Sequence, residues 1–503
     1  MRLGQRTLGV SAGLWLAGSA HPAGLTAQQE LRPIVFAHVT VIAVADNRPM
    51  VDQAVVISGN RIVAVGPTAT VDVPKGSRMV TARDKFLIPG LWDMHAHLPD
   101  DSTTRALMFP LYLANGVTGL RDMWGDCESI CAGTDSAGIA PPALVVRAWK
   151  HDIAVGTLLG PRLIAAGHGL VGPGGPGFPG THAVADSADA VAAVLHAKAQ
   201  GADFLKVMGD VPPSAYFVLL RTARAHGLSV VGHVPAGVSP FVVSDSGQRS
   251  IEHLQGAMPE CASGQDSLMV LRAARARDTS ATQRAVLRHA MNHVLVSTFD
   301  EESCQPYFTR LVQNDTWQVP TLVVTRERAW LWEHDTRRDP HFRYATSTYR
   351  RIWDPRSDDF YLKGWSSEDF ASLKEVYAGD LRIVGAMARA GVPLLAGSDV
   401  LDPYVYPGFS LHEEMSILVD AGLSPQAALA AATTAPARFF QATDSLGSIA
   451  VGQLADLVLL DADPLTDIRN ASSIRAVVVN GQLLTRKDLD HLLRGAEAYA
   501  KAH

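Results

Sequence analysis

The chain has 503 residues, of which 47% are hydrophobic and 19% are charged, and its formal net charge at pH 7 is −6. This composition is typical of a globular protein that buries more than one core, and it excludes a disordered chain or a coiled coil. Because the charge is mildly acidic and no basic run occurs, nothing in the sequence indicates a protein that binds nucleic acid.

Residues 1–27 have the pattern of an export signal. Arg2 and Arg6 precede an apolar stretch of small residues, and Ala27 is a candidate for the last residue before the cleavage site. The apolar stretch is shorter than the roughly 20 residues that a membrane-spanning helix needs. We therefore expect an exported protein, periplasmic or extracellular, with no attachment to a membrane once the signal is removed.

Both ends of the remaining chain are predicted to be rich in β-structure. Residues 28–86 contain β-branched runs on either side of Gly59-Asn60, a hairpin signal, and residues 441–503 contain similar runs with a turn at Asn480-Gly481. We expect the two segments to pair into one small β-sandwich domain, followed by a C-terminal tail.

Between these ends, residues 87–440 alternate short apolar runs with helical stretches rich in Ala, Leu and Arg. The runs predicted to be strands cover residues 88–97, 116–123, 161–167, 203–208, 228–234, 249–254, 319–324 and 391–399. This alternation predicts a parallel (β/α)8 barrel. A doubly wound open sheet is the alternative, but no glycine-rich phosphate turn follows the first predicted strand.

Side chains that can bind a metal end five of the predicted strands, and the active site of such a barrel forms where these ends meet. They are His95, His97, Lys206, His233, His253 and Asp399. Any one of them alone is more simply a hydrogen-bonded histidine, an ion-paired lysine or a helix cap. Together they predict a metal site, and imidazole and carboxylate ligands suit zinc or a similar divalent ion. Lys206 has no lone pair as an ammonium group, so it could bind a metal only if modified or deprotonated.

The sequence resembles the amidohydrolase superfamily over nearly all of the chain that follows the export signal. The stretch "IPGLWDMHAH" is similar to the metal motif on the first strand of that superfamily, the later ligands follow in the same order, and residues 423–468 resemble its closing region. The stretches "GADFLKVM" and "SIEHL" resemble the subgroup of prolidase-like dipeptidases and imidazolonepropionase-like proteins. The peptidase side is favoured, because imidazolonepropionase proper holds one metal and uses no carboxylated lysine.

The resemblance implies two divalent metal ions, expected to be zinc. One ion would be held by His95, His97 and Asp399 and the other by His233 and His253. Lys206, carboxylated by CO₂, would bridge the two. A homo-oligomer is an expectation from the resemblance alone.

The implied activity is hydrolysis of an amide or peptide bond in a dipeptide, an N-acyl amino acid or a related small molecule, by attack of a hydroxide that bridges the two metals. Asp399 would accept the proton of this hydroxide and deliver it to the leaving amine. The same ligands would also serve a lactonase, an esterase or a cyclic-amide hydrolase. A deaminase, or a metal-binding barrel that has lost catalysis, completes the set of alternatives.

Three further side chains are candidate site residues. Tyr216 could donate a hydrogen bond to a tetrahedral oxyanion, or it could simply pack in a helix. Arg121 could bind a substrate carboxylate as a two-pronged donor, or it could pair with Asp122. His168, just past the third predicted strand, is also predicted to face the mouth of the barrel.

The four cysteines suit an oxidising compartment. Cys261 with Cys304 would tie the ends of a long insertion, and Cys127 with Cys131 would close a small loop, although the sequence does not settle the connectivity. Residues 325–380 are rich in aromatic side chains and follow a strand end. They could form an apolar wall for a hydrophobic acyl group, or they could be ordinary helix packing.

Overall fold

The computed structural model describes residues 32–44, 48–99, 101–124, 145–174, 181–357, 360 and 365–503. The predicted export signal, residues 1–27, and both Cys127 and Cys131 lie outside these described residues. Among the helices that the structure describes, none combines the length and the apolar character that a membrane span requires.

Strands from both ends of the described chain form one sheet, in the order β16–β15–β14–β5–β1–β2–β3, with β4 paired to β1. Its strands are β1 (Ile34–Ala43), β2 (Arg48–Ser58), β3 (Arg61–Pro67), β4 (Arg78–Thr81), β5 (Phe86–Pro89), β14 (Leu457–Leu460), β15 (Ile474–Val479) and β16 (Gln482–Thr485). The two ends of the chain meet where β14 runs antiparallel to β5, with Val458 opposite Ile88. The predicted pairing of the β-rich ends is therefore confirmed.

The second sheet is parallel along its main path and forms most of a barrel, in the order β13–β12–β11–β10–β8–β7–β6. Its strands are β6 (Leu91–Ala96), β7 (Val117–Asp122), β8 (Arg162–Val171), β10 (Phe204–Val207), β11 (Ser229–Gly232), β12 (Ser250–Glu252) and β13 (Trp317–Val319). A short strand, β9 (Thr181–Ala183), pairs in parallel with the end of β8. Buried side chains such as Met94, Phe204 and Trp317 share one hydrophobic cluster drawn from several of these strands.

Residues 393–399 take the place of the eighth strand and close the barrel. On one side, the amide of Gln318 donates to the carbonyl oxygen of Pro393 at 3.0 Å. On the other side, the amide of Met94 donates to the carbonyl oxygen of Ala396 at 2.9 Å, and the amide of Asp399 donates to that of His95 at 2.7 Å. The predicted (β/α)8 barrel is confirmed.

Two predicted strands differ from the observed ones. The first predicted strand, residues 88–97, is divided at Gly90 into β5 and β6. A Cβ at Gly90 would lie 1.9 Å from Oγ1 of Thr118, so the chain can cross between the two sheets here only with glycine. The seventh, residues 319–324, ends at β13 because Pro320 has no amide hydrogen for the sheet and Thr321 adopts a φ of 48°. A helix begins at Leu322 instead.

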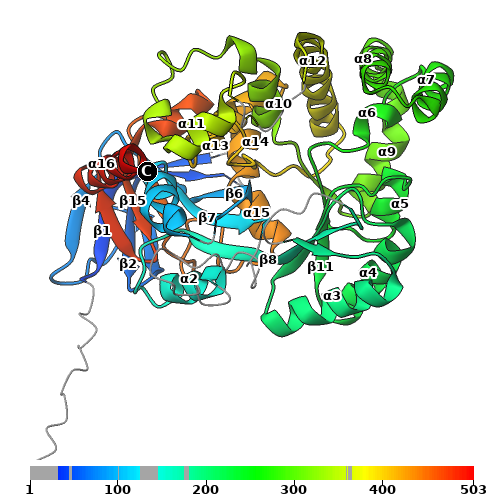
Figure 1. The fold of residues 1–503 in the computed structure, drawn as a ribbon. Coiled ribbons are helices and arrows are strands. Elements are labelled where there is room, and N and C mark those ends of the chain that lie inside the picture. Colours follow the sequence, from blue (N-terminus) through cyan, green and yellow to red (C-terminus); the bar gives the residue numbers. More distant parts are fainter. Residues whose placement is uncertain are drawn as a thin grey trace, which may run out of the picture. The chain divides into compact units, whose positions relative to one another are not determined.

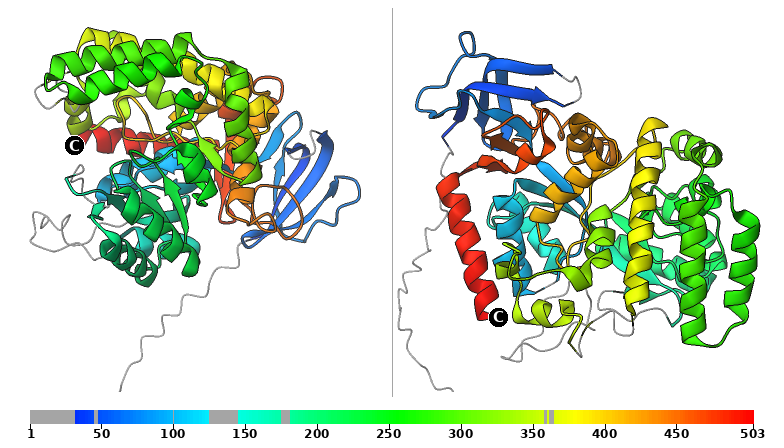
Figure 2. Two further views of the ribbon diagram at one scale, coloured as in Figure 1. Left: turned by 90° about the vertical axis from the view of Figure 1, so that its right-hand side faces the viewer. Right: turned by 90° about the horizontal axis from the view of Figure 1, so that it is seen from above.

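Helices surround the barrel, and Figure 1 shows α3 and α4 side by side along its outer face. The α-helices are α1 (Phe109–Ala114), α2 (Val145–Ala154), α3 (Ser187–Gln200), α4 (Pro213–Ala225), α5 (Pro240–Asp245), α6 (Ala257–Glu260), α7 (Gln265–Arg277), α8 (Ala281–Ser297), α9 (Glu301–Gln313), α10 (Leu322–Ala329), α11 (Ser347–Trp353), α12 (Ser367–Arg389), α13 (Phe409–Asp420), α14 (Pro425–Ala431), α15 (Thr434–Phe439) and α16 (Arg486–Ala502). The predicted C-terminal tail is α16, which leaves the terminal sheet and packs along α1 through Leu111, Ala496 and Ala500 (Figure 2).

The insertion between β12 and β13 contains α6, α7, α8 and α9. A disulfide joins Cys261, at the end of α6, to Cys304 in α9, so this predicted pairing is confirmed. Because α6 begins a few residues after His253, the disulfide anchors the insertion next to that strand end.

Replacing both Cys261 and Cys304 by alanine is expected to lower the free energy of unfolding by about 2–4 kcal/mol. The bond closes a loop with a sequence separation of 43, and its loss gives the unfolded chain more freedom. The measurement is the urea midpoint of the double variant against the parent. The parent unfolded in a reducing buffer should share the midpoint of the variant, and an unchanged midpoint would contradict the expectation.

Candidate metal centre

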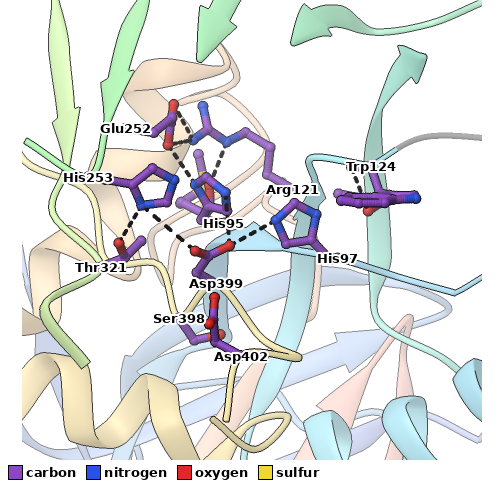
Figure 3. A network of polar contacts seen from close by, with 12 residues as sticks. His95, His97, Arg121, Trp124, Glu252, His253, Thr321, Ser398, Asp399 and Asp402 are labelled. Carbon is purple, nitrogen blue, oxygen red and sulfur yellow. Dashed lines mark hydrogen bonds and ion pairs between the residues drawn. The ribbon is translucent and has the colours of Figure 1, made fainter. Parts of the chain in front are cut away.

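Three of the predicted ligands lie in contact at the carboxyl end of the barrel. Oδ1 of Asp399 lies 2.8 Å from Nε2 of His97 and 3.3 Å from Nε2 of His95. One ligand atom from each of the three residues lies within 4.8 Å of the others. Figure 3 shows the Asp399 carboxylate between the imidazole rings, an arrangement that could hold one cation.

The structure brings the other three predicted ligands to the same place. The ring of His253 lies 4.7 Å from that of His95 and 5.1 Å from that of His233, centre to centre, and its Nδ1 lies 3.8 Å from Oδ2 of Asp399. Lys206 is buried close enough for its charge to lower the pKa of each of these three histidines, although burial contributes more. The six residues therefore form one cluster, and their role as metal ligands stays a prediction.

Several nitrogen atoms of this cluster form no hydrogen bond within the described part of the chain. They are Nε2 of His95, Nδ1 of His97 and Nζ of Lys206, and all three atoms are buried. Buried polar atoms are normally hydrogen-bonded, so these atoms indicate a partner outside the described residues, and a metal ion is one such partner. Burial also lowers the pKa of His95 to about 3 and that of Lys206 to about 8. The neutral imidazole that this favours is the form that binds a metal, so the residues fit divalent ions.

Asp93 fixes the two strands that carry the cluster against each other. It lies two residues before His95 in β6, on the same face of the strand. Its carboxylate accepts hydrogen bonds from the amide and the hydroxyl of Ser398, at 2.9 and 2.5 Å. Burial raises the pKa of Asp93 to about 6. Gly397 allows the close approach, because a Cβ there would lie 2.7 Å from Cβ of His95.

Glu252 is a buried neighbour of the cluster that the sequence did not reveal. Its Oε2 lies 2.8 Å from Nδ1 of His95, and both carboxylate oxygens accept hydrogen bonds from Arg121, at 2.9 and 3.0 Å. Burial opposes ionisation of this carboxyl, but Arg121 and His95 outweigh burial and hold the pKa of Glu252 well below its usual range. When Nδ1–H of His95 donates to Glu252, Nε2 is the nitrogen left to face the cluster. Glu252 is thus a candidate positioning residue for His95.

Replacing Glu252 by glutamine is expected to lower the free energy of unfolding by about 3–5 kcal/mol, because the buried Arg121 loses its charged partner. Metal affinity is expected to fall about 10–100-fold, because His95 loses the carboxylate that orients it. Urea unfolding and competition with a chelator measure the two effects. The matched control is Glu302→Gln, at an exposed position of α9. A loss of stability with unchanged metal affinity would make the role of Glu252 purely structural.

Arg121 does not lie where a substrate could reach it. Its side chain is fully buried, and its Nε donates to the carbonyl oxygen of Met94 at 2.6 Å. Its charged partner is Glu252 and not Asp122, so both predicted roles are wrong. Strand β7 points this guanidinium into the barrel below the mouth, where it neutralises a buried carboxylate.

Tyr216 and His168 also lie apart from the predicted roles. Tyr216 lies buried in α4, and its hydroxyl donates to Oε1 of Gln248 at 2.8 Å. It therefore packs in a helix, which was the simpler of its two predicted roles. His168 lies within β8 and not past it, and its ring faces His182 and His196 on the outer side of the barrel. Neither side chain joins the cluster at the mouth.

The aromatic-rich segment forms a packed cluster of its own. Trp353, Phe360 and Phe370 are buried against one another and against Tyr404 and Tyr406. Helix packing, the simpler of the two interpretations, therefore describes most of this segment.

The fold is a barrel whose mouth holds a cluster of side chains that could bind a metal ion. A model of the amidohydrolase family matches residues 377–485. Ochratoxinase from Aspergillus niger is 25% identical over 516 residues, which cover 91% of this chain and 89% of that protein. Two solved structures share the fold. The bottromycin amidohydrolase has a TM-score of 0.66 and 24% identity, covering 93% of this chain and 90% of its own. A Xaa-Pro dipeptidase has a TM-score of 0.61 and 18% identity, covering 90% of this chain and 100% of its own.

The family match and the ochratoxinase relative support the resemblance to the amidohydrolase superfamily, and the solved structures support the fold. The family match also supports a hydrolase that acts on C–N bonds.

Proposed function

We propose that this protein is a dinuclear metal hydrolase that cleaves the amide or peptide bond of a dipeptide, an N-acyl amino acid or a related small amide. The observation that carries the proposal is the cluster at the barrel mouth. There the buried Nζ of Lys206 and Nε2 of His95 lack hydrogen-bond partners among the described residues, beside the ionised carboxylate of Asp399.

In this proposal, His95, His97 and Asp399 hold one ion, and His233 with His253 hold the other. Lys206 joins the two sets as a carbamate. Its neutral amine adds to CO₂: an N–C bond forms, one C=O π bond of CO₂ breaks and one proton is released. The product presents two carbamate oxygens that share one negative charge, in place of a nitrogen that has no hydrogen-bond partner among the described residues. Imidazole and carboxylate donors favour zinc. When bound, the two ions would polarise the carbonyl group of the substrate and acidify the attacking water.

Asp399 is the proposed proton carrier. Its amide donates to the carbonyl oxygen of His95, and its carboxylate faces three imidazole rings, so it is held at the centre of the cluster. Those rings hold the pKa of Asp399 well below its usual range despite its burial, so the carboxylate is ionised before the substrate reacts. As the C–O bond forms, it takes the proton of the attacking water, and as the C–N bond breaks, it gives this proton to the departing amine.

The substrate class rests on likeness to relatives. The named activities of the related proteins are those of an ochratoxinase, an amidohydrolase and a Xaa-Pro dipeptidase. All three act in the context of a similar barrel, which supports small amides and peptides as the substrates of this chain.

The test is a panel of Xaa-Pro dipeptides, N-acyl amino acids, esters and lactones, assayed with zinc-loaded protein. We expect turnover of amides or peptides that is lost on chelation and restored by zinc. Turnover confined to esters or lactones would replace the proposed activity. A metal-loaded protein that turns over none of the panel would favour a barrel that has lost catalysis.

We also propose that the protein is exported. The disulfide between Cys261 and Cys304 suits an oxidising compartment, and residues 1–27 have the pattern of a cleavable signal. N-terminal sequencing of the secreted or periplasmic protein should start just after Ala27, and a cytoplasmic protein with an intact N-terminus would contradict the proposal.

A further inference from the structure

Three histidines converge on the outer side of the barrel, apart from the candidate metal centre. His168 lies in β8, His182 in the adjoining strand β9 and His196 in helix α3. Their ring centres lie 5.5 Å apart for His168 and His196, 6.2 Å for His168 and His182, and 6.5 Å for His182 and His196. We call these residues the outer histidine trio.

The rings of the outer trio, at 5.5 to 6.5 Å between centres, lie somewhat further apart than those of a three-histidine metal site. With zinc–nitrogen distances of about 2.0–2.1 Å in a tetrahedral site, three imidazole centres lie about 5 Å from one another. The histidine rings of the candidate metal centre are separated by 4.7 to 5.2 Å, which is the same scale. Binding one ion would require side-chain rotations that move each ring by about an ångström toward the others, and water could take the fourth position.

The outer trio is accessible from solvent. His182 is exposed and the other two rings are half-buried, so an ion can reach them from solvent. Lys150 lines the same surface hollow as His168, but both carboxylate oxygens of Asp203 accept hydrogen bonds from its ammonium group, at 2.6 and 2.5 Å. The charge of Lys150 is therefore compensated.

The elements that carry the trio explain what an ion would do there. Strand β9 already pairs with β8, with His182 opposite Leu170, whereas α3 follows β9 and packs on the outside of the barrel. An ion on all three rings would tie strand β8, its edge strand and the outer helix together. Because it binds the folded state and not the unfolded chain, it would also stabilise the fold.

We propose that His168, His182 and His196 form a further divalent-metal site, with zinc as its ion, that clamps helix α3 to strands β8 and β9. The site is structural and separate from the metal centre at the mouth. It does not depend on the proposed activity, because its ligands come from the outer face of the barrel.

The test compares the parent with His168→Ala combined with His196→Ala, by equilibrium dialysis against Zn²⁺ and measurement of zinc per chain. We expect the double variant to bind one equivalent fewer than the parent and to lose part of the increase in melting temperature that added zinc gives. Its turnover of any amide substrate should stay within about twofold of the parent. The matched control is His226→Ala, an exposed histidine at the end of α4, which should bind as much zinc as the parent.

Equal zinc in the parent and the double variant would overturn the proposal. The proposal would also be overturned if the folded double variant lost both one equivalent of zinc and its activity. The lost zinc would then belong to the metal centre at the mouth. His182→Gln replaces an exposed side chain and keeps the fold even if the double variant does not. His182→Gln should weaken the affinity of the protein for one of its zinc ions by more than about tenfold. Unchanged affinity would also overturn the proposed site.

Discussion

Replacing Asp399 by asparagine is expected to lower kcat by about 10²–10⁴-fold or more while the protein stays folded. Asparagine has the size of aspartate but no charge, so it cannot accept the proton of the attacking water or return it to the leaving amine. It also loses the charge that faces Nε2 of His97 at 2.8 Å and Nε2 of His95 at 3.3 Å. If kcat falls by a much larger factor than the metal content does, Asp399 acts as the proton carrier.

The kinetics of Asp399→Asn are to be measured at saturating zinc, with metal content and circular dichroism recorded on the same sample. The matched control is Asp420→Asn, which makes the same change at the exposed end of α13 and should keep parental activity. Full activity in the folded Asp399→Asn variant would remove this residue from the mechanism. Activity that recovers completely with excess zinc would make Asp399 a ligand and not a proton carrier.

The barrel and its cluster could be predicted because both follow from short-range patterns. Alternation of apolar runs with helical stretches indicates parallel strands, and the ends of parallel strands must converge. His95, His233 and Asp399 are far apart in the sequence, yet each stands at such an end, and the structure brings them together.

Glu252 could not be predicted because backbone geometry overrides the alternation of the strand. It directly precedes His253, so a regular strand would place the two side chains on opposite faces. His253 instead adopts a φ of 59°, a left-handed turn that carries its ring to the mouth, while Glu252 points into the barrel. Its ion pair with Arg121 spans 131 residues of sequence, and no local pattern reports such a contact.

The interpretation of His168 was wrong for a related reason. The pairing of β8 with β10 shifts register between Phe204 and Lys206, so His168 falls in an irregular stretch of its strand. A single added residue reverses the face to which a side chain points, and a sequence shows no sign of it. The end of the seventh strand, by contrast, can be predicted from the sequence, because Pro320 by itself argues against a strand that continues to residue 324.

Replacing Lys206 by methionine is expected to reduce the zinc held at the mouth from two equivalents to one or fewer, and turnover by at least about 100-fold. Like lysine, methionine is long and unbranched, so it can occupy the buried site, where Lys206 is only 2% exposed. It removes a nitrogen without a hydrogen-bond partner among the described residues, so the fold should keep its stability. What it removes from the chemistry is the amine that would react with CO₂.

The role of Lys206 as a bridge can be separated from a role in packing. Zinc is to be counted with His168→Ala and His196→Ala also present, so that the outer trio does not add to the total. Protein loaded with ¹³C-labelled bicarbonate should show a carbamate carbon signal that Lys206→Met lacks and that Lys198→Met, at an exposed position of α3, retains. Added acetate should restore part of the second equivalent, because a free carboxylate can supply the missing oxygens. One equivalent in parent and variant alike would make Lys206 structural, and a single-metal chemistry such as that of the deaminases would then replace the dinuclear hydrolase.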